Sequence, residues 1–350
     1  MGDKHTIRLQ PVDIEFQVDE DETILDGAFR QGLMLMHGCK EGQCAACKSF
    51  VLEGEVDMDK YSTFALPDFE EEEGWTLLCK AHAVSDVDIE LVNYDEEVLR
   101  SGIPTKEVVV TVAELEPLTS DIWRLALDLD PADEFEYKPG QYVDITVPGT
   151  DDVRSFSMAS VPSTPNRLEF MIRHYPGGKF AGGFADGTLQ PGHRLDVKGP
   201  FGSFTLRERP ERRLLFIGGG AGMAPIVSLL RARREAGCTR RSVFYYGARG
   251  TADLFQVDEL EGLQQQLADF AFVPVLSDAD PGPDWTGETG FVTDVVRRLE
   301  GDLRDVDAYL CGPPPMVDAA MELLLGQGLA EDRIYFDKFT TSAETEGSSL

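Results

Sequence analysis

The chain has 350 residues, of which 42% are hydrophobic, and carries a formal net charge of −31 at pH 7. This length predicts two or three domains, and the hydrophobic fraction is ordinary for a globular protein. So large a negative charge argues against nucleic acid as a partner. No membrane span is expected, because no apolar run approaches the roughly eighteen residues that one needs.

The negative charge is concentrated near the N-terminus. Residues 1–98 hold 24 Asp and Glu against 7 Lys and Arg, a net charge of −17. A solvated acidic surface explains such charges. The alternative is an acidic face that docks on a basic patch of an electron acceptor. The sequence leaves both interpretations open, and it predicts a solvated loop for the acidic run 68–73.

Alternating apolar residues predict a small β-rich domain at the N-terminus. Residues 7–9 and 14–18 indicate two strands joined by a turn, and residues 87–91 indicate a closing strand. A short helix is expected over 23–29, with Thr23 or Asp21 as its cap.

Four cysteines in this domain form the most specific motif of the chain. Cys39, Cys44 and Cys47 follow the spacing C-x4-C-x2-C, and Cys79 lies far downstream. This is the ligand arrangement of a plant-type [2Fe–2S] cluster. A disulfide is disfavoured because the polar start does not resemble a secretory signal, and a structural zinc site usually has two C-x2-C knuckles. The motif therefore predicts one-electron chemistry.

The pattern changes twice after this domain. Residues 94–105 are polar and predict a linker. Residues 106–205 hold many short alternating runs separated by Pro and Gly, which predicts a closed β-barrel. From residue 212, apolar runs alternate with helix-like segments, which predicts a parallel sheet wound on both faces. The expected strands are 214–217, 243–246, 270–276 and 308–311, and the expected helices are 223–236, 255–268, 291–300 and 314–326.

Two motifs in this last region suggest nucleotide binding. The loop from Gly218 to Gly222 follows a strand and opens a helix, where backbone N–H groups and the helix dipole favour a pyrophosphate. The loop departs from G-x-G-x-x-G because Met223 takes the last place, so a plain tight turn is the alternative. The second motif, Cys311-Gly312-Pro313, ends the last main strand, where ligands of α/β sheets bind. A buried structural thiol is the alternative for Cys311.

The barrel region holds a third motif. In Arg154-Ser155-Phe156-Ser157 a guanidinium could grip a flavin phosphate, and a hydroxyl could bond a ring nitrogen. The segment 177–181 adds a turn suited to anions at an expected helix start. A surface arginine is the alternative for Arg154.

Taken in order, these motifs resemble the ferredoxin–NAD(P)+ reductase superfamily over residues 5–339. The chain is most similar to reductase components of multicomponent oxygenases that serve soluble di-iron monooxygenases of the propane, methane and phenol type. The resemblance implies a β-grasp [2Fe–2S] ferredoxin domain at 1–98, an FAD-binding antiparallel β-barrel at 106–208 and a doubly wound NAD-binding domain at 209–339. Residues 340–350 are expected to be a disordered tail.

The resemblance also implies roles for single residues. The four cysteines would bind the cluster, and Cys311 and Ser157 would lie at the reacting atoms. The remaining cofactor-binding residues implied are Arg154, Phe156, Gly178, Lys179, Ala181, Gly218, Gly219, Gly220, Gly222, Gly312, Pro313 and Phe339. Phe156 replaces a tyrosine that is frequent at its position, so stacking can persist without a hydroxyl contact. Phe339 is a candidate for the aromatic side chain that covers the flavin, although eleven residues follow it.

These assignments predict a conversion between two-electron and one-electron carriers. NADH delivers a hydride, a [2Fe–2S] cluster accepts single electrons, and FAD can exchange both. The residues leave the choice between NADH and NADPH open, because Arg249 would suit a 2′-phosphate and Asp253 a free ribose hydroxyl. The resemblance implies NADH. The expected partner is an oxygenase hydroxylase, and a cytoplasmic monomer is expected.

Two rival functions remain at this stage. The first is a reductase for a Rieske-type aromatic dioxygenase, which the sequence barely separates from a monooxygenase reductase. The second is a redox sensor or carrier that binds the same cofactors without turnover, and the intact series of motifs argues against it.

Overall fold

The computed structural model describes residues 3–278 and 282–339, so the tail expected at 340–350 lies outside the described residues. The chain divides into two compact units. The first consists mainly of residues 3–106, and the second of residues 107–198 and the described residues from 204 to 339.

The first unit has the β-grasp fold that was expected. Its sheet has the order β2-β1-β7-β3-β5, in which β1 is antiparallel to β2 and parallel to β7. The helix α1 (Ile24–Arg30) begins at Thr23, whose side chain accepts a hydrogen bond from the Asp26 N–H, so the predicted cap is confirmed. The strands are β1 (Lys4–Gln10), β2 (Ile14–Asp19), β3 (Lys48–Glu53), β4 (Val56–Met58), β5 (Trp75–Leu77), β6 (Ala81–Ala83) and β7 (Val87–Leu91).

Two short helices in this unit correct the sequence predictions. The acidic run predicted as a loop forms α2 (Asp68–Glu73), because three acidic residues lie in its first turn and Gly74, at φ +105°, ends it. The polar segment predicted as a linker contains α3 (Glu96–Arg100), whose first turn is capped by the Asp95 carboxylate. The sequence analysis missed both helices because they are short and mostly charged, so neither shows an apolar helical periodicity.

The second unit begins with the predicted barrel. Its six strands have the order β11-β10-β13-β8-β9-β12. The two edges meet just after β11, where Met158 forms an antiparallel bridge to Phe170 and the Ala159 N–H donates to the Glu169 carbonyl at 2.7 Å. The elements are β8 (Lys106–Pro117), β9 (Ile122–Leu129), β10 (Tyr142–Thr146), β11 (Val153–Ser157), β12 (Arg167–Arg173), α4 (Gly182–Ala185) and β13 (Arg194–Phe201).

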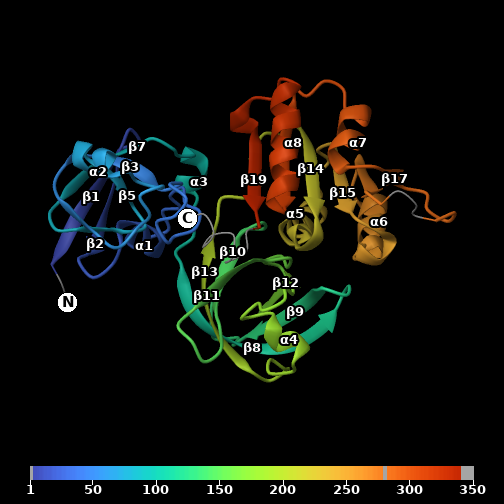
Figure 1. The fold of residues 1–350 in the computed structure, drawn as a ribbon, viewed down its shortest axis with the longest axis horizontal. Coiled ribbons are helices and arrows are strands. Elements are labelled where there is room, and N and C mark those ends of the chain that lie inside the picture. Colours follow the sequence, from blue (N-terminus) through green and yellow to red (C-terminus); the bar gives the residue numbers. More distant parts are fainter. Residues whose placement is uncertain (1–2, 279–281, 340–350) are drawn as a thin grey trace. The chain divides into compact units, whose positions relative to one another are not determined.

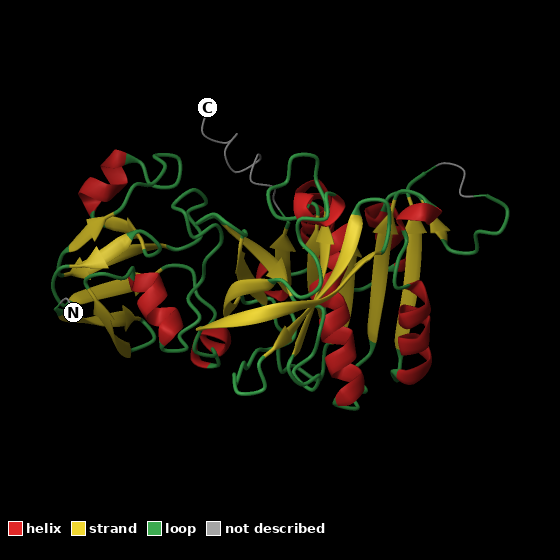
Figure 2. Cartoon of the chain, turned by 90° about the horizontal axis from the view of Figure 1, so that it is seen from below, coloured by secondary structure: helices red, strands yellow, loops and turns green. Residues whose placement is uncertain are grey.

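The C-terminal half of the second unit is a doubly wound parallel sheet, as predicted (Figure 1 and Figure 2). The strand order is β17-β16-β15-β14-β18-β19, and all neighbouring strands are parallel. From β14 the chain adds strands outward on one side as far as β17, and it then continues on the other side of β14 with β18 and β19. Alternate strand residues form two cores: Phe216 packs with α5 and α6, whereas Leu215 packs with α7 and α8. The strands are β14 (Arg213–Gly219), β15 (Ser242–Ala248), β16 (Phe270–Leu276), β17 (Glu288–Thr289), β18 (Val306–Gly312) and β19 (Ile334–Lys338). The helices are η1 (Gly220–Gly222), α5 (Met223–Glu235), η2 (Thr251–Asp253), α6 (Val257–Gln266), α7 (Val292–Leu299), α8 (Pro314–Gly326) and η3 (Glu331–Arg333).

This change of side between β14 and β18 sets the position of the nucleotide motifs. The loop after β14 and the motif that ends β18 follow neighbouring parallel strands, so both lie at the carboxyl edge of the sheet. Ligands of open α/β sheets bind at such a point. β17, β19 and the barrel strand β11 were not among the predicted strands.

Candidate functional site

The cysteine loop is a tight turn that directs N–H groups at sulfur. Lys40, Gly42 and Ala45 all have positive φ angles, at +57°, +69° and +57°. The N–H groups of Glu41 and Gln43 donate to Cys39 Sγ at 3.4 and 3.2 Å. Such donors stabilise thiolates, which are the iron-binding form of cysteine.

The four cysteines form two pairs. Cys47 Sγ lies 3.3 Å from Cys79 Sγ, well beyond a disulfide bond length, and Cys39 is hydrogen-bonded to Cys44. The bond with Cys44, together with the backbone donors, lowers the pKa of Cys39 to about 5, and the bond with Cys79 lowers the pKa of Cys47. Among the described residues, no three His, Cys, Asp or Glu side chains are grouped to hold one metal ion. Two pairs instead suit a binuclear cluster that takes two thiolates at each iron.

Close packing at Gly38 supports this arrangement. A Cβ atom at Gly38 would lie 2.8 Å from Cys44 Sγ. Only glycine therefore lets the backbone pass the sulfur at this distance, and the residues present fit the cluster.

In the barrel, the cationic residues predicted to bind a flavin phosphate gather around one carboxylate. Lys179 Nζ lies 2.6 Å from Asp152 Oδ2. The hydrogen bond and charge of Lys179, and the charge of Arg154, lower the pKa of Asp152. Two cations from β11 and from the turn before α4 thus lie within electrostatic reach of the Asp152 carboxylate, and Lys179 is paired with it.

The aromatic and helix-start predictions occupy the same region. The Phe156 ring lies 5.0 Å from the Phe180 ring, between centroids. The expected helix is the four-residue α4, which begins at Gly182 with Ala181 in the cap position. The Gly178 N–H donates to the Tyr175 carbonyl at 2.9 Å, so it is already engaged.

The two nucleotide motifs touch each other. A Cβ atom at Gly222 would lie 2.4 Å from Gly312 Cα and 2.5 Å from the Cys311 carbonyl oxygen. A Cβ atom at Gly219 would lie 2.9 Å from the Gly247 carbonyl oxygen. Helix α5 starts without a side-chain cap and directly continues η1, where the Met223 N–H donates to the Ala221 and Gly220 carbonyls. Pro313 is the cap residue of α8.

Asp337, which sequence reasoning missed, links the two residues predicted to lie at the reacting atoms. Ser157 Oγ donates to Asp337 Oδ2 at 3.2 Å, and Asp337 on β19 is in register with Cys311 on β18. Burial raises the pKa of Asp337 to about 6, although the Ser157 hydrogen bond acts in the opposite direction. Burial, together with the Asp337 charge, raises the pKa of the Cys311 thiol well above its usual value. The run Ile334-Tyr335-Phe336, rich in residues that favour strands, was the signal that could have identified this strand.

Cys311 itself is fully buried, in the core cluster that contains residues of both the barrel and the α/β domain. Phe339 packs against that cluster, and its N–H donates to the Gly312 carbonyl at 3.0 Å. Contact between the thiol and a nicotinamide therefore requires a neighbouring side chain to move.

The residues considered for ribose recognition lie at the end of β15. Arg249 is exposed, whereas Asp253 Oδ2 accepts the Gly250 N–H at 2.9 Å. Asp278, after β16, approaches the same glycine, because a Cβ atom there would lie 3.1 Å from its Oδ2. Two carboxylates at one glycine make this edge unfavourable for an additional phosphate.

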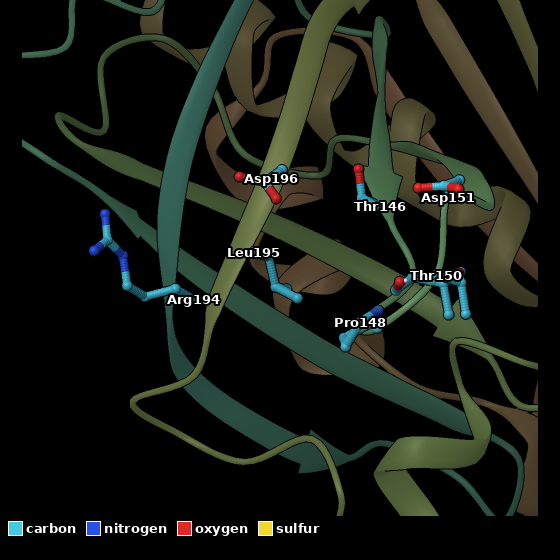
Figure 3. Close-up of a pocket in the computed structure, with 9 residues that line it drawn as sticks. Thr146, Pro148, Thr150, Asp151, Arg194, Leu195 and Asp196 are labelled. Atoms are coloured by element: carbon cyan, nitrogen blue, oxygen red, sulfur yellow. Dashed lines mark hydrogen bonds between the residues drawn. The ribbon is translucent and has the colours of Figure 1, made fainter.

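An open pocket on the barrel holds none of the predicted residues. It lies between the turn after β10 and strand β13, where Arg194 extends away from Thr150 (Figure 3). Its lining residues are Thr146, Val147, Pro148, Gly149, Thr150, Asp151, Arg194, Leu195 and Asp196.

The described part of the chain contains no helix with the length and apolar character to span a membrane.

Comparison with known families matches the three regions in order. Residues 7–84 match the 2Fe-2S iron-sulfur cluster binding domain, residues 109–206 the oxidoreductase FAD-binding domain, and residues 216–322 the oxidoreductase NAD-binding domain. The fold and the site together define a flavin- and iron–sulfur-containing, NADH-dependent oxidoreductase.

Curated relatives and solved structures narrow this class. The chain is 54% identical to the propane 2-monooxygenase reductase component of Rhodococcus jostii, over 98% of this chain and 93% of the relative. It is 37% identical to the phenol 2-monooxygenase reductase component DmpP of Pseudomonas sp., over 99% and 97%. The cytochrome P450 reductase GcoB of Amycolatopsis has a similar structure, with a TM-score of 0.85 and 31% identity over 96% and 99% of the two chains. The chain belongs to the family of monooxygenase reductase components.

Proposed function

We propose that this chain passes electrons from NADH, through FAD and a [2Fe–2S] cluster, to the hydroxylase of a propane-oxidising di-iron monooxygenase. The observation that carries this proposal is the 54% identity to a propane 2-monooxygenase reductase component over 347 residues, which includes all three domains. The domain assignments proposed are 1–98, 106–208 and 209–339.

Each group of predicted site residues has a separate role in binding a cofactor. When bound, FAD supplies the exchange between a two-electron donor and a one-electron acceptor. Arg154 and Lys179 bind its phosphates, Phe156 packs against it, and Ser157 orients its ring through a hydrogen bond. The cysteine pairs bind the cluster, and the glycine loop after β14 binds the dinucleotide. No side chain has to act as a nucleophile, so placement of the reacting groups is the catalytic contribution of the protein.

The Ser157–Asp337 pair supports the proposed roles of Ser157 and Cys311. A serine that donates to a carboxylate is held in one rotamer, and a carboxyl whose pKa is raised to about 6 can exchange a proton near neutral pH. Cys311 packs next to Asp337 as an uncharged group, because burial raises the pKa of its thiol well above the usual value. Gly312, Pro313 and Phe339 complete this side of the proposed site.

We further propose a monomer located in the cytoplasm. None of the six cysteines, all of which lie in the described residues, forms a disulfide, which suits a reducing compartment, and NADH is supplied there. Sedimentation of the loaded protein tests the oligomeric state: a mass of about one chain is expected, and a dimer would overturn this part of the proposal.

The functional test is reconstitution. The anaerobic protein should show flavin and iron–sulfur absorption bands that bleach with NADH, and NADH should support propane oxidation when the hydroxylase is added. NADPH should be the poorer donor. Protein that bleaches normally but supports an aromatic-ring dioxygenase and no monooxygenase would favour the Rieske alternative, which the 32% identity to a toluate 1,2-dioxygenase component keeps open. Protein that binds the cofactors without turnover would be a sensor or carrier.

A further inference from the structure

Neutral groups hold a buried arginine near the C-terminal end of α5. Arg233 is 2% exposed. Its Nη1 donates to Ser242 Oγ at 2.7 Å, and its Nη2 donates to the Arg240 carbonyl. Arg231, two residues earlier on the same helix, forms ion pairs with two glutamates instead. Within the described residues no such pair forms at Arg233, so its positive charge is buried without a carboxylate counter-ion.

The Nε atom of this arginine is also buried, and no aligned hydrogen bond satisfies it within the described residues. An additional acceptor beside Nε would therefore stabilise the folded chain. The acidic group that faces the guanidinium is the Cys238 thiol. Burial lowers the pKa of Arg233, the charge and hydrogen bond of Cys238 act in the opposite direction, and the charge of Arg240 adds to the lowering. The thiol and the guanidinium thus lie close enough to interact.

The turn that ends α5 brings these two residues together. Gly237 has a φ of +60°, and the Cys238 N–H donates to the Arg233 carbonyl at 2.9 Å. Cys238 is half-buried, and nothing lies within 4 Å of a Cβ at Gly237, so small molecules in solution can reach the turn. The negative end of the helix dipole disfavours an anion here, but it amounts to about half a charge against the full charge of the guanidinium.

We propose that Cys238 is a site of reversible oxidation by hydrogen peroxide, and that Arg233 binds the sulfenate that forms. The thiol proton passes to solvent, and the sulfur attacks one oxygen of the peroxide. The O–O bond breaks as the S–O bond forms, and the departing hydroxide takes up a proton to give water. Sulfur loses two electrons and the peroxide gains them. The negative sulfenate oxygen lies one bond beyond the sulfur, where it accepts from Nε and supplies the counter-ion of the guanidinium.

The oxidant is a by-product of the proposed function. A reduced flavoprotein without an electron acceptor can pass two electrons and two protons to O2, which gives hydrogen peroxide. Oxidation of Cys238 would then mark protein that consumes NADH without its hydroxylase. The inference rests on the proposed function for this source of peroxide alone, since added peroxide can replace it.

The test adds hydrogen peroxide and excess dimedone, which traps sulfenic acids, to the cofactor-loaded protein. Mass spectrometry of peptides then follows the label on Cys238, which should appear about 10-fold faster than label on glutathione under the same conditions. Arg233→Gln should slow the labelling about 10-fold, because the guanidinium charge is lost, and Arg233→Lys should recover part of the rate. The matched control is Arg234→Gln, the same change at the next and exposed residue, which should leave the rate unchanged.

A second measurement needs no variant of Arg233. Peroxide-treated wild type should unfold at a temperature about 2 °C or more above that of the untreated protein, because the buried cation has gained an anionic partner. A thiol reductant should reverse the shift. Cys238→Ser is the control, since damage by peroxide at the cluster or elsewhere would appear equally in this variant.

The outcomes separate the site from the proposed function. Equal labelling rates in wild type and Arg233→Gln, or labelling of Cys238 no faster than that of glutathione, would overturn the inference. A shift in unfolding temperature that Cys238→Ser shares would also overturn it. Wild type that never oxidises NADH but is labelled as expected by added peroxide would overturn the proposed function and support the site. Labelling by added peroxide, without labelling during aerobic turnover of NADH, would overturn the proposed source of the oxidant.

Discussion

At the residue scale, the site depends on side chains whose neighbours change their chemistry. The Asp337 carboxyl is half-buried beside Ser157 and Cys311, and its desolvation raises the pKa of Asp337 to about 6. The cysteine pairs show the opposite effect, because hydrogen bonds lower the pKa of one thiol in each pair. In both places, the neighbouring atoms set the protonation state of the side chain.

Asp337→Asn is expected to alter the pH dependence of stability. The pKa of Asp337 is about 6 in the folded state against an ordinary value of 3.8, so the folded protein binds this proton more tightly than the unfolded chain. The wild type therefore loses stability as pH rises from about 4 to about 6, by up to roughly 3 kcal/mol. Urea unfolding between pH 4 and 7.5 should show a variant-minus-wild-type difference that grows through this window. Ser157→Ala should shift the window upward, and a difference independent of pH would contradict this prediction.

Cys79→Ser is expected to abolish assembly of the cluster, because the remaining thiolate of its pair cannot hold an iron alone. Iron content and the visible iron–sulfur bands measure the loss, which should be nearly complete. Flavin absorption and NADH-driven ferricyanide reduction should persist. The matched control is Cys238→Ser, at a cysteine outside the pairs; a similar loss of iron in this control would refute the assignment.

At the element scale, the loop after β14 and the helix α2 are each held by a contact with another part of their own unit. The loop after β14 lies against the end of β18 with no space for a side chain at Gly222. The helix α2 is acidic on its exposed side, and the Tyr61 hydroxyl donates to Glu71 of this helix at 2.6 Å. The next residue, Ser62, donates its N–H to the carbonyl of Gly42 in the cysteine loop at 3.0 Å. The first contact joins the two proposed nucleotide motifs, and the second fixes α2 to the cysteine loop.

Gly222→Ala is expected to impair nucleotide binding and to destabilise the protein by about 1–3 kcal/mol, because the new Cβ overpacks the contact with Gly312. Thermal unfolding and the KM for NADH measure the two effects. Gly326→Ala is the control, since nothing lies within 4 Å of a Cβ there. Alanine also favours the helix end, so the control should be neutral or slightly stabilising. Unchanged NADH binding in Gly222→Ala would contradict the proposed site.

The surface of α2 is predicted to dock on the hydroxylase. Phe69 is 62% exposed and neighbours an exposed acidic run, a combination that suits a basic partner with an apolar centre. The triple change Phe69→Ala, Glu72→Gln and Glu73→Gln should raise the KM for hydroxylase about fivefold at low salt, and less at high salt. Ferricyanide reduction should be unaffected. Glu53→Gln with Glu90→Gln controls for the charge lost, and an equal effect there would argue for a general acidic surface.

At the scale of the whole second unit, an ion-pair chain connects the barrel to the α/β domain. Glu169 on β12 lies 2.5 Å from Arg124 on β9 and 2.9 Å from Arg231 on α5, and Arg231 also pairs with Glu259 on α6. Burial acts to raise the pKa of Glu169, but the bonds and charges of the two arginines outweigh it and hold that pKa below its usual value. These ion pairs join the barrel to the α/β domain, the two domains that would share FAD and NADH.

Glu169→Gln is expected to lower the free energy of unfolding by about 2 kcal/mol at neutral pH, because two half-buried arginines lose a charged partner. Since the pKa of Glu169 is depressed in the folded state, its stabilisation is present above the ordinary value of 4.5 and is lost as pH falls further. Denaturant unfolding at pH 7 and pH 3.5 should therefore show a smaller difference at the lower pH. Glu136→Gln, at an exposed barrel position, should have no effect, and a pH-independent cost for Glu169→Gln would refute the argument.

The sequence alone was sufficient for the class of protein and for much of the fold. The spacing of Cys39, Cys44 and Cys47, the glycine loop after β14 and the strand periodicities are local patterns, and each restricts the backbone without help from distant residues. The same local criteria failed at α2, α3 and β19, where short or highly charged segments acquire their structure from caps and packing.

Only the tertiary structure decided which distant residues meet. Asp337 reaches Ser157 across 180 positions of sequence, and Arg173 reaches Gly220 from another domain. These contacts depend on strand order and on the packing of the barrel against the α/β domain, which no local pattern encodes. The sequence therefore determined which chemical groups the protein has, and the fold determined which of them act together, because proximity in space is a property of the whole packed chain.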